Sequence, residues 1–312
     1  MEADTPILPT KTCSARINGA CVCGAVRWSY DAPLAAMLHC HCSVCRKHHG
    51  TFFATFVAAP LGTFHWRAGT EQISTWQSSE RGKRSFCALC GSKVPSVDYD
   101  AQQVFMPAGA LEGELGIRPQ MHLFTASRAD AYQIHDGLPQ HAEFPSEWGA
   151  RGLETPARPT RPGIVSGSCA CGSMRFEIDG QPLRMHHCHC GRCRRARGAA
   201  HATNVIYRLE TLRYTAGEEL LSDFDLPGAR YFGTSFCRNC GGAMPRRSAS
   251  RGVVVVPVSS LDSDPQIHPL AHQFVAAKAP WFDIHDGVPQ YPEAAPNPPP
   301  ISTPAAAPSD SC

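Results

Sequence analysis

The sequence has no long apolar run and no concentration of charge of one sign. Its 312 residues carry a net charge of +2, and only 18% of them are charged. No apolar stretch approaches the roughly 20 residues that a helix needs to cross a bilayer. Lysine and arginine are spread along the chain and form neither a basic stripe nor a polybasic segment. We therefore expect neither a membrane nor a nucleic acid as partner, and the sequence indicates no particular oligomeric state.

The N-terminal residues also show no export signal. The opening MEADTPILPTKTC is acidic and then polar, and it lacks the apolar core of a signal peptide. We expect a cytoplasmic protein, in which thiols stay reduced.

Cysteine, by contrast, is abundant, with sixteen residues. Cysteines at this density form either a disulfide framework, typical of small secreted domains, or metal sites, typical of close clusters in a reducing compartment. This chain is long enough for two domains, 43% of its residues are hydrophobic, and its cysteines fall in C-x-C and C-x-x-C clusters. Metal ligation is the favoured interpretation.

The chain contains an internal repeat. Four segments recur in the same order: GACVCGAVRW at 19–28 and GSCACGSMRF at 167–176; HCHCSVCRKHHG at 39–50 and HCHCGRCRRARG at 187–198; FCALCGSKVP at 86–95 and FCRNCGGAMP at 236–245; IHDGLPQ at 134–140 and IHDGVPQ at 284–290. The offset is 148 residues in the first two pairs and 150 in the others. Seven cysteines recur, and only Cys13 and Cys312 stand outside the pattern.

Strand signals dominate both copies. Alternating or β-branched segments such as AVRWSY, MRFEI and GVVVVPV predict strands, and the best helix candidate directly follows the third cysteine of the HCHC cluster. We predict a mainly β protein with a first domain at 17–145, a linker at 146–163 and a second domain at 164–292. The residues after Gln290 include seven prolines, so we predict a disordered tail at 293–312.

Two cysteine pairs in each copy predict a structural zinc site. In C-x-x-C-G the glycine permits a left-handed backbone that can turn N–H groups toward sulfur. A closed zinc site needs four ligands, which the C-x-C-G pair completes; the alternative is that these cysteines are small buried apolar residues. The predicted ligands are Cys21, Cys23, Cys87 and Cys90 in the first copy and Cys169, Cys171, Cys237 and Cys240 in the second. Each such site stabilises a fold by on the order of 10 kcal/mol.

The remaining cysteines form two sets of three, which are Cys40, Cys42 and Cys45, and Cys188, Cys190 and Cys193. Three protein ligands leave a fourth position, which a substrate occupies in an open site and a histidine closes in a structural one. His39, His41, His187 and His189 are close enough in sequence to be that histidine. Arg46, Lys47, Arg194 and Arg195 follow directly, and Arg46 and Arg194 are candidates for offsetting thiolate charge or binding an anionic ligand.

Taken together, C-x-C-G, H-C-x-C-x-x-C-R, F-C-x-x-C-G and D-G-[LV]-P-Q resemble the glutathione-dependent formaldehyde-activating enzyme/centromere protein V family. The resemblance covers about residues 17–145 and 164–292. It implies two β-tent domains with two zinc ions each, up to four in all. The four-cysteine sets would hold structural zinc, and the three-cysteine sets would hold a labile zinc at the active site. It also implies a carbon–sulfur lyase activity that reversibly joins glutathione and formaldehyde.

The two copies differ beyond their cysteines. Phe53 is matched by His201, which suggests different pocket walls and makes His201 a candidate catalytic residue. Trp281 is matched by Ala131 and is expected in the core. His135 and His285 are candidate proton carriers, whereas the Asp-Gly pairs that follow them are expected to form turns.

Three functions are consistent with these patterns. The first is a zinc-dependent lyase that acts on an adduct of glutathione, or another small-molecule thiol, with an aldehyde. The second is an enzyme of specialised metabolism that keeps the fold and the open zinc for another substrate. The third is a non-catalytic zinc-stabilised interaction module.

Overall fold

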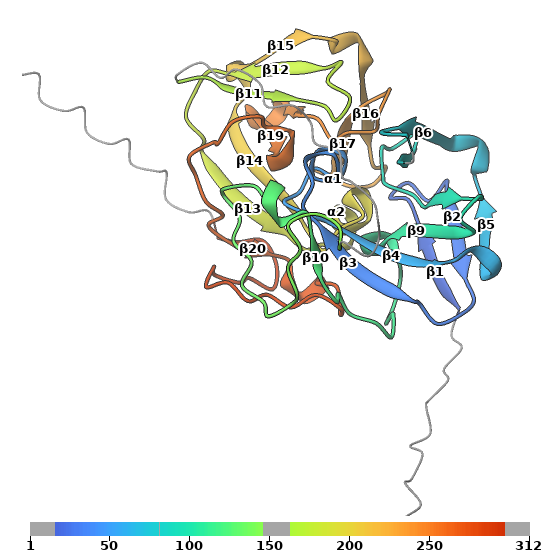
Figure 1. Cartoon of the computed structure of the whole chain (residues 1–312). Helices are drawn as coiled ribbons and strands as arrows, with labels where there is room; N and C mark the ends of the chain where they lie inside the picture. The colour runs from blue at the N-terminus through green and yellow to red at the C-terminus, as the bar shows by residue number, and fades with distance from the viewer. Residues whose placement is uncertain (1–15, 81, 146–162, 297–312) are drawn as a thin grey trace, which may run out of the picture.

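The computed structural model describes residues 16–80, 82–145 and 163–296. All of the predicted linker but its last residue, and the predicted tail beyond residue 296, lie outside these residues, so the predicted domain boundaries stay predictions. In the described part, no helix is both long and apolar enough to span a membrane. The prediction of a mainly β chain built from two repeated domains is confirmed (Figure 1).

The described part of the first repeat contains ten strands in three sheets. The sheet orders are β1-β2-β5, β6-β7 and β10-β3-β4-β9-β8. The strands are β1 (Ile17–Ala20), β2 (Arg27–Tyr30), β3 (Ala36–Cys40), β4 (Ala54–Pro60), β5 (Phe64–Ala68), β6 (Ile73–Gln77), β7 (Lys83–Cys87), β8 (Ser96–Asp98), β9 (Gln103–Pro107) and β10 (His122–Leu123).

The second repeat reproduces this arrangement strand for strand. Its sheets run β11-β12-β15, β16-β17 and β18-β19-β14-β13-β20. The strands are β11 (Val165–Ser168), β12 (Arg175–Ile178), β13 (Arg184–Cys188), β14 (Ala202–Arg208), β15 (Leu212–Ala216), β16 (Leu221–Asp225), β17 (Gly233–Cys237), β18 (Arg246–Ser248), β19 (Val253–Pro257) and β20 (His272–Gln273).

Each repeat has one short α-helix in its described part, α1 (Ser43–His49) and α2 (Gly191–Arg197). Both begin two residues before the third cysteine of the cluster, slightly earlier than predicted. The Sγ of Cys42 or Cys190 caps the helix by accepting the backbone N–H of Cys45 or Cys193. Both end at a left-handed glycine, Gly50 or Gly198. Single 3₁₀ turns connect the strands: η1 (Leu61–Thr63), η2 (Thr70–Gln72), η3 (Ala108–Ala110), η4 (Thr125–Ser127), η6 (Leu209–Thr211), η7 (Glu218–Leu220), η8 (Ala249–Arg251), η9 (Val258–Ser260) and η10 (Val275–Ala277).

The two repeats pack against each other through reciprocal contacts. The two helices lie near the centre of the molecule (Figure 1), where α1 contacts η9 and α2 contacts η3. A Cβ on Gly91 would lie 2.4 Å from the Phe236 ring, and a Cβ on Gly241 would lie 2.4 Å from the Phe86 ring. Only glycine permits this approach, so the two C-x-x-C-G turns lie against each other. The buried Lys93 joins them by donating to the carbonyls of Gly91 and Gly241.

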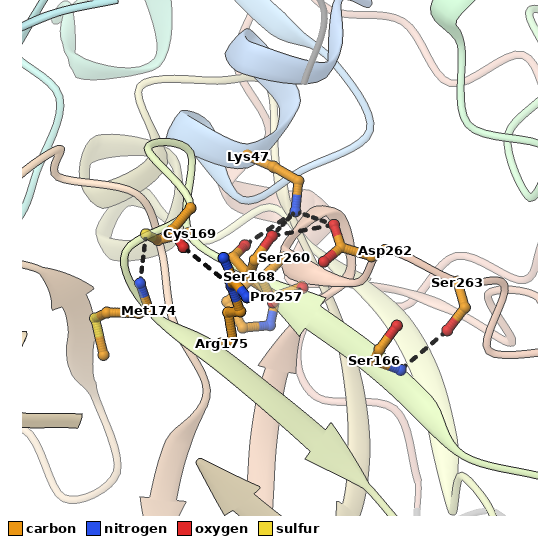
Figure 2. A network of polar contacts seen from close by, with 11 residues as sticks. Lys47, Ser166, Ser168, Cys169, Met174, Arg175, Pro257, Ser260, Asp262 and Ser263 are labelled. Carbon is orange, nitrogen blue, oxygen red and sulfur yellow. Dashed lines mark hydrogen bonds and ion pairs between the residues drawn. The ribbon is translucent and has the colours of Figure 1, made fainter. Parts of the chain in front are cut away.

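A buried ion pair also joins the repeats (Figure 2). The Nζ of Lys47, on α1, lies 2.5 Å from a carboxylate oxygen of Asp262 and donates at 3.0 Å to both oxygens of Ser168. Both charged side chains are less than 8% exposed. The matching pair, Arg195 with Glu112, lies at the surface. Ser168 directly precedes Cys169. The ion pair therefore connects α1, which carries Cys45 of the first repeat, to the four-cysteine set of the second repeat.

Candidate metal centres

The four-cysteine sets predicted from the repeat come together in space. In each, the four thiol sulfurs lie within 4.8 Å of one another. Sulfurs that bind one zinc ion in a tetrahedron at 2.3 Å lie about 3.8 Å apart. In the first set the Sγ–Sγ distance is 3.3 Å for Cys21 and Cys23 and 3.8 Å for Cys23 and Cys87. In the second set it is 3.4 Å for Cys169 and Cys171 and 4.0 Å for Cys171 and Cys237. All fourteen cysteines of the described part are free thiols, and these two sets could each hold a zinc ion.

The turns that position these thiols have the predicted left-handed glycines, but the glycine N–H groups do not bond sulfur. Gly91 and Gly241 have φ values of 68° and 67°, in the left-handed region. Their N–H groups bond the carbonyls of Cys87 and Cys237 instead of sulfur. The N–H bonds to sulfur come from nearby residues, including Val26 to Cys21 at 3.3 Å.

The three-cysteine sets also come together. The first triad is Cys40, Cys42 and Cys45, and the second triad is Cys188, Cys190 and Cys193. In each triad the sulfurs lie within 4.8 Å of one another, and no histidine of the described chain joins either group. The first cysteine is the last residue of a strand, and the other two are at the start of the following helix. Each triad could therefore hold a metal ion with one coordination position left over.

Strand alternation explains why the neighbouring histidines stay apart from the triads. Successive side chains of a strand point to opposite faces, so His39 on β3 points away from Cys40, and His187 on β13 points away from Cys188. His39 and His187 instead bond Thr55 and Thr203 through Nδ1. The Nε2 of His41 bonds the Nδ1 of His122, and His189 bonds His272 in the same way.

The walls of the two triads differ. The first triad is buried among apolar side chains. Ala54 and Phe124 recur in the second repeat as Ala202 and Phe274, whereas the following six differ there: Leu38, Phe56, Trp76, Met121, Leu123 and Phe144. The matching positions of the second repeat are smaller or more polar, namely His186, Asn204, Phe224, Ala271, Gln273 and Ala294. Two of the three cysteines of the second triad, Cys190 and Cys193, are partly exposed.

One thiol in each triad has a lowered pKa, whereas hydrogen bonds within the triad and burial raise the pKa of the other two. Hydrogen bonds from Cys40 and Cys42, with the positive charge of Arg84 nearby, hold the pKa of Cys45 well below its usual range. The Nη2 of Arg84 lies 3.6 Å from the Cys45 sulfur. In the second triad, hydrogen bonds from Cys188 and Cys193 lower the pKa of Cys190 to about 2. Each triad thus contains a thiolate at neutral pH, the form that binds metal.

The remaining candidates lie at the backbone of the triads, at a cavity and in the core. Arg46 and Arg194 donate from Nε to the carbonyls of His41 and His189, the residues between the first two cysteines of each triad. This contact fixes the backbone of each triad. His135 and His285 are exposed and line a cavity between the repeats. Trp281 is 3% exposed and lies in the core, as expected.

The sequence interpretation missed three sets of residues. Arg84 precedes the F-C-x-x-C-G motif by two residues, and the only signal was that Thr234 stands at its place in the second repeat. His122 and His272 lie in two-residue strands that no pattern marks. Asp136 and Asp286 form the expected turns by accepting N–H bonds from Leu138 and Val288, but they also bind Nε2 of those two histidines.

His201 lies in a cluster between the repeats. It is 2% exposed, and its ring contacts Phe53 of the other repeat at 5.6 Å between centroids. Burial, reinforced by neighbouring histidines, lowers the pKa of His201 well below its usual value, so its ring is neutral. His201 and Phe53 therefore belong to one shared cluster, which corrects the interpretation that they line two separate pockets.

Comparisons with known proteins match this arrangement. The family described as "Glutathione-dependent formaldehyde-activating enzyme" matches at residues 16–127 and again at 164–277. A Halomonas elongata protein, provisionally named a glutathione-dependent formaldehyde-activating enzyme, is 30% identical over 156 residues, which are 44% of this chain and 98% of that protein. A Rhodobacter sphaeroides protein of known crystal structure is 28% identical in sequence to this chain. The match covers 32% of this chain and 89% of that protein's chain, with a TM-score of 0.26. The two family matches together span more than half of the chain, which therefore belongs to the glutathione-dependent formaldehyde-activating enzyme family as a tandem pair of family domains.

Proposed function

We propose that the protein is a zinc-dependent carbon–sulfur lyase that acts on the adduct of a small-molecule thiol, glutathione, with an aldehyde such as formaldehyde. The four-cysteine sets would hold structural zinc, and the triads would hold zinc with a free position. Zinc at such a position holds a thiol as its thiolate at neutral pH. The three-thiol groups without a histidine and the family membership support this proposal.

The second triad is the better candidate for the working site. Side chains two residues apart on a strand share a face, so Arg184, His186 and Cys188 share one face of β13. The matching face of β3 carries Ala36, Leu38 and Cys40. A cationic and polar face beside a thiol site suits glutathione, which carries carboxylates and a peptide backbone. This contrast between the two faces is the observation that carries the assignment.

Two unpaired polar atoms support it further. The Nδ1 of His186 and the Oδ1 of Asn204 are buried and make no hydrogen bond in the described part of the chain. The two residues are directly opposite each other on β13 and β14. Buried polar atoms without partners cost stability, and a polar ligand at this face would supply the missing partners.

In this account the protein mainly orients the reactants. His186 and Asn204 hold polar groups of the thiol compound, and Arg184 offsets its carboxylate charge. Arg194 fixes the backbone between Cys188 and Cys190. Holding the thiol beside the aldehyde removes much of the entropic cost of their encounter.

A residue exchange between the repeats tests the proposal. His186→Leu installs the residue of the first repeat, and we expect glutathione binding to weaken by at least about tenfold, the effect of losing one strong hydrogen bond. Leu38→His is the matched control and leaves binding unchanged. Calorimetric titration measures binding, and exchange NMR with labelled formaldehyde measures adduct turnover.

The outcomes separate the three functions. Loss of binding and turnover in Cys190→Ser, with the zinc of the four-cysteine sites retained, supports the proposed lyase. Glutathione binding without adduct turnover points to another substrate on the same site. Absence of any thiol binding by the zinc-loaded protein contradicts the proposal and leaves a zinc-stabilised interaction module.

A further inference from the structure

A cavity between the repeats is lined by side chains that the thiol chemistry does not use. Its volume is about 20 Å³, enough for a single water or metal ion. Six of the second-repeat side chains that line it carry metal-ligand atoms, namely His187, His201, His272, Asp283, His285 and Asp286. Of these, His187, His201, His272 and Asp286 form the group described below.

The sheet brings these side chains to one face. On β13, His187 is opposite Thr203 of β14 and next to His272 of β20. Two residues before Thr203, His201 shares its face. The rings of His187 and His201, and those of His187 and His272, have centroids 4.5 Å apart. Cys188 points to the opposite face, so the histidines form a group separate from the second triad.

Thr203 sets the orientation of two of the rings. Its Oγ1 lies 2.9 Å from Nδ1 of His187 and 3.2 Å from Nδ1 of His201. A hydroxyl oxygen has two lone pairs, so it can accept from both rings while donating to Thr51, 3.5 Å away. Both Nε2 atoms then carry lone pairs, and neither bonds any described residue. Such outer contacts commonly hold metal-binding histidines in place.

His272 and Asp286 complete the set. The Nε2 of His272 lies 2.9 Å from a carboxylate oxygen of Asp286, and its Nδ1 lies 2.8 Å from Nε2 of His189. Ligand atoms of His187, His272 and Asp286 all lie within 4.8 Å of one another. A cation between them would take the place of the proton on Nε2 of His272, and His272 would then donate from Nδ1 to His189.

We propose that His187, His272 and Asp286, with His201 beside them, bind a divalent first-row transition-metal ion at a site distinct from the cysteine sites. Two or three imidazoles with one carboxylate suit zinc, cobalt, nickel or iron(II) and disfavour calcium or magnesium. The side chain of Asp286 is 21% exposed, which gives an entry path from solvent.

The first repeat provides an internal comparison. It has the same three residue types in His39, His122 and Asp136, but they do not gather within the same range among the described residues. Phe53 there takes the place of His201. The second-repeat group thus has both the closer ligands and the additional imidazole.

The test uses the full-length protein with its cysteine sites filled with zinc, titrated with Co²⁺. We expect one Co²⁺ per chain, with visible d–d absorption and no thiolate charge-transfer band. Anomalous scattering at the cobalt edge in crystals should locate the ion between His187, His272 and Asp286. Asp286→Asn keeps the acceptor for the Val288 N–H. Losing an outer contact of a metal site costs up to about 100-fold in affinity, so we expect the loss of Asp286 as a ligand to weaken Co²⁺ binding by more than that.

Two further variants complete the design. Asp136 lines the same cavity from the first repeat but belongs to no group of close ligand atoms among the described residues. Asp136→Asn should therefore leave Co²⁺ affinity unchanged, whereas His201→Phe should weaken it. Absence of Co²⁺ binding, a cobalt peak only at cysteines, or equal losses in Asp136→Asn and Asp286→Asn overturns the proposal. The anomalous map of the unmodified protein decides the question even where a variant folds poorly, and glutathione binding at the second triad is unaffected by the answer.

Discussion

Phe53 and His201 occupy the same position in the two repeats and face each other across the boundary between them, with perpendicular rings 5.6 Å apart. The same position of the two repeats thus forms a contact between them. Histidines lie on both sides of the boundary, with His39 and His41 beside Phe53 and His187 and His189 beside His201. Both residues are at most 2% exposed, so any change here affects both repeats.

His201 makes stability depend on pH. Burial lowers its folded pKa well below the value of about 6.5 in the unfolded chain. Between these two pKa values the unfolded state binds one proton more than the folded state. The contribution of the neutral His201 to the free energy of unfolding is therefore complete above about pH 6.5 and declines as the pH falls. One such proton changes the free energy of unfolding by about 1.4 kcal/mol per pH unit.

His201→Phe should reduce the slope of stability against pH by about that amount between pH 5 and 6. Denaturant unfolding at several pH values in buffer free of added metal measures it. An unchanged slope would show that His201 takes up its proton in the folded state. Phe53→Leu is the control, since it changes the same cluster without removing a titratable group and should leave the slope as it is.

Lys47 should be essential to the contact between the repeats. Lys47→Met leaves the carboxylate of Asp262 buried without its partner, and we expect a loss of about 3–5 kcal/mol in the free energy of unfolding. Arg195→Met breaks the matching surface pair and should cost at most about 1 kcal/mol. Denaturant unfolding compares the two variants, and equal losses would contradict the account.

The two four-cysteine sites should stabilise each other. The Oγ1 of Thr234 donates to the carbonyl of Cys90 at 2.7 Å, and Lys93 joins both turns. Cys90→Ser removes a ligand of the first site, so we expect zinc release from both sites at a lower denaturant concentration. Zinc release followed with a chromogenic chelator measures this, and Cys13→Ser is the control. Unchanged release from the second site would show that the repeats unfold independently.

Arg84 should retain zinc at the first triad. Three thiolates exceed the charge of one zinc ion, and Arg84 supplies a nearby positive charge in a buried site. Arg84→Thr installs the residue of the second repeat and should speed zinc loss to a chelator. The neighbouring Lys83 is exposed, and Lys83→Thr should leave the rate unchanged. Equal rates in both variants would contradict this role.

Much of the fold and of the metal centres could be predicted from local sequence patterns. Each cysteine set consists of ligands close together in sequence, or of two short motifs that recur in order, so spacing alone was enough to group them. Side chains alternate between the two faces of the strands that end at Cys40 and Cys188. Each of these cysteines therefore lies on the face opposite to the histidine before it, His39 or His187.

The rest depends on contacts between distant segments. His272 reaches His187 only because a two-residue strand pairs in parallel beside β13, and a segment this short has no periodicity to detect. Arg84 approaches Cys45 from a hairpin about forty residues away in sequence. The meeting of Phe53 and His201 depends on how two domains dock, which no pattern within either repeat encodes.

The central claim is that each triad holds zinc with a free position and that the second triad binds the thiol. A crystal structure of the full chain soaked with glutathione, with anomalous data at the zinc edge, tests this most directly. The account predicts zinc at both four-cysteine sites and both triads, with the glutathione sulfur as fourth ligand at Cys188, Cys190 and Cys193. A histidine nitrogen as fourth ligand at both triads would contradict it.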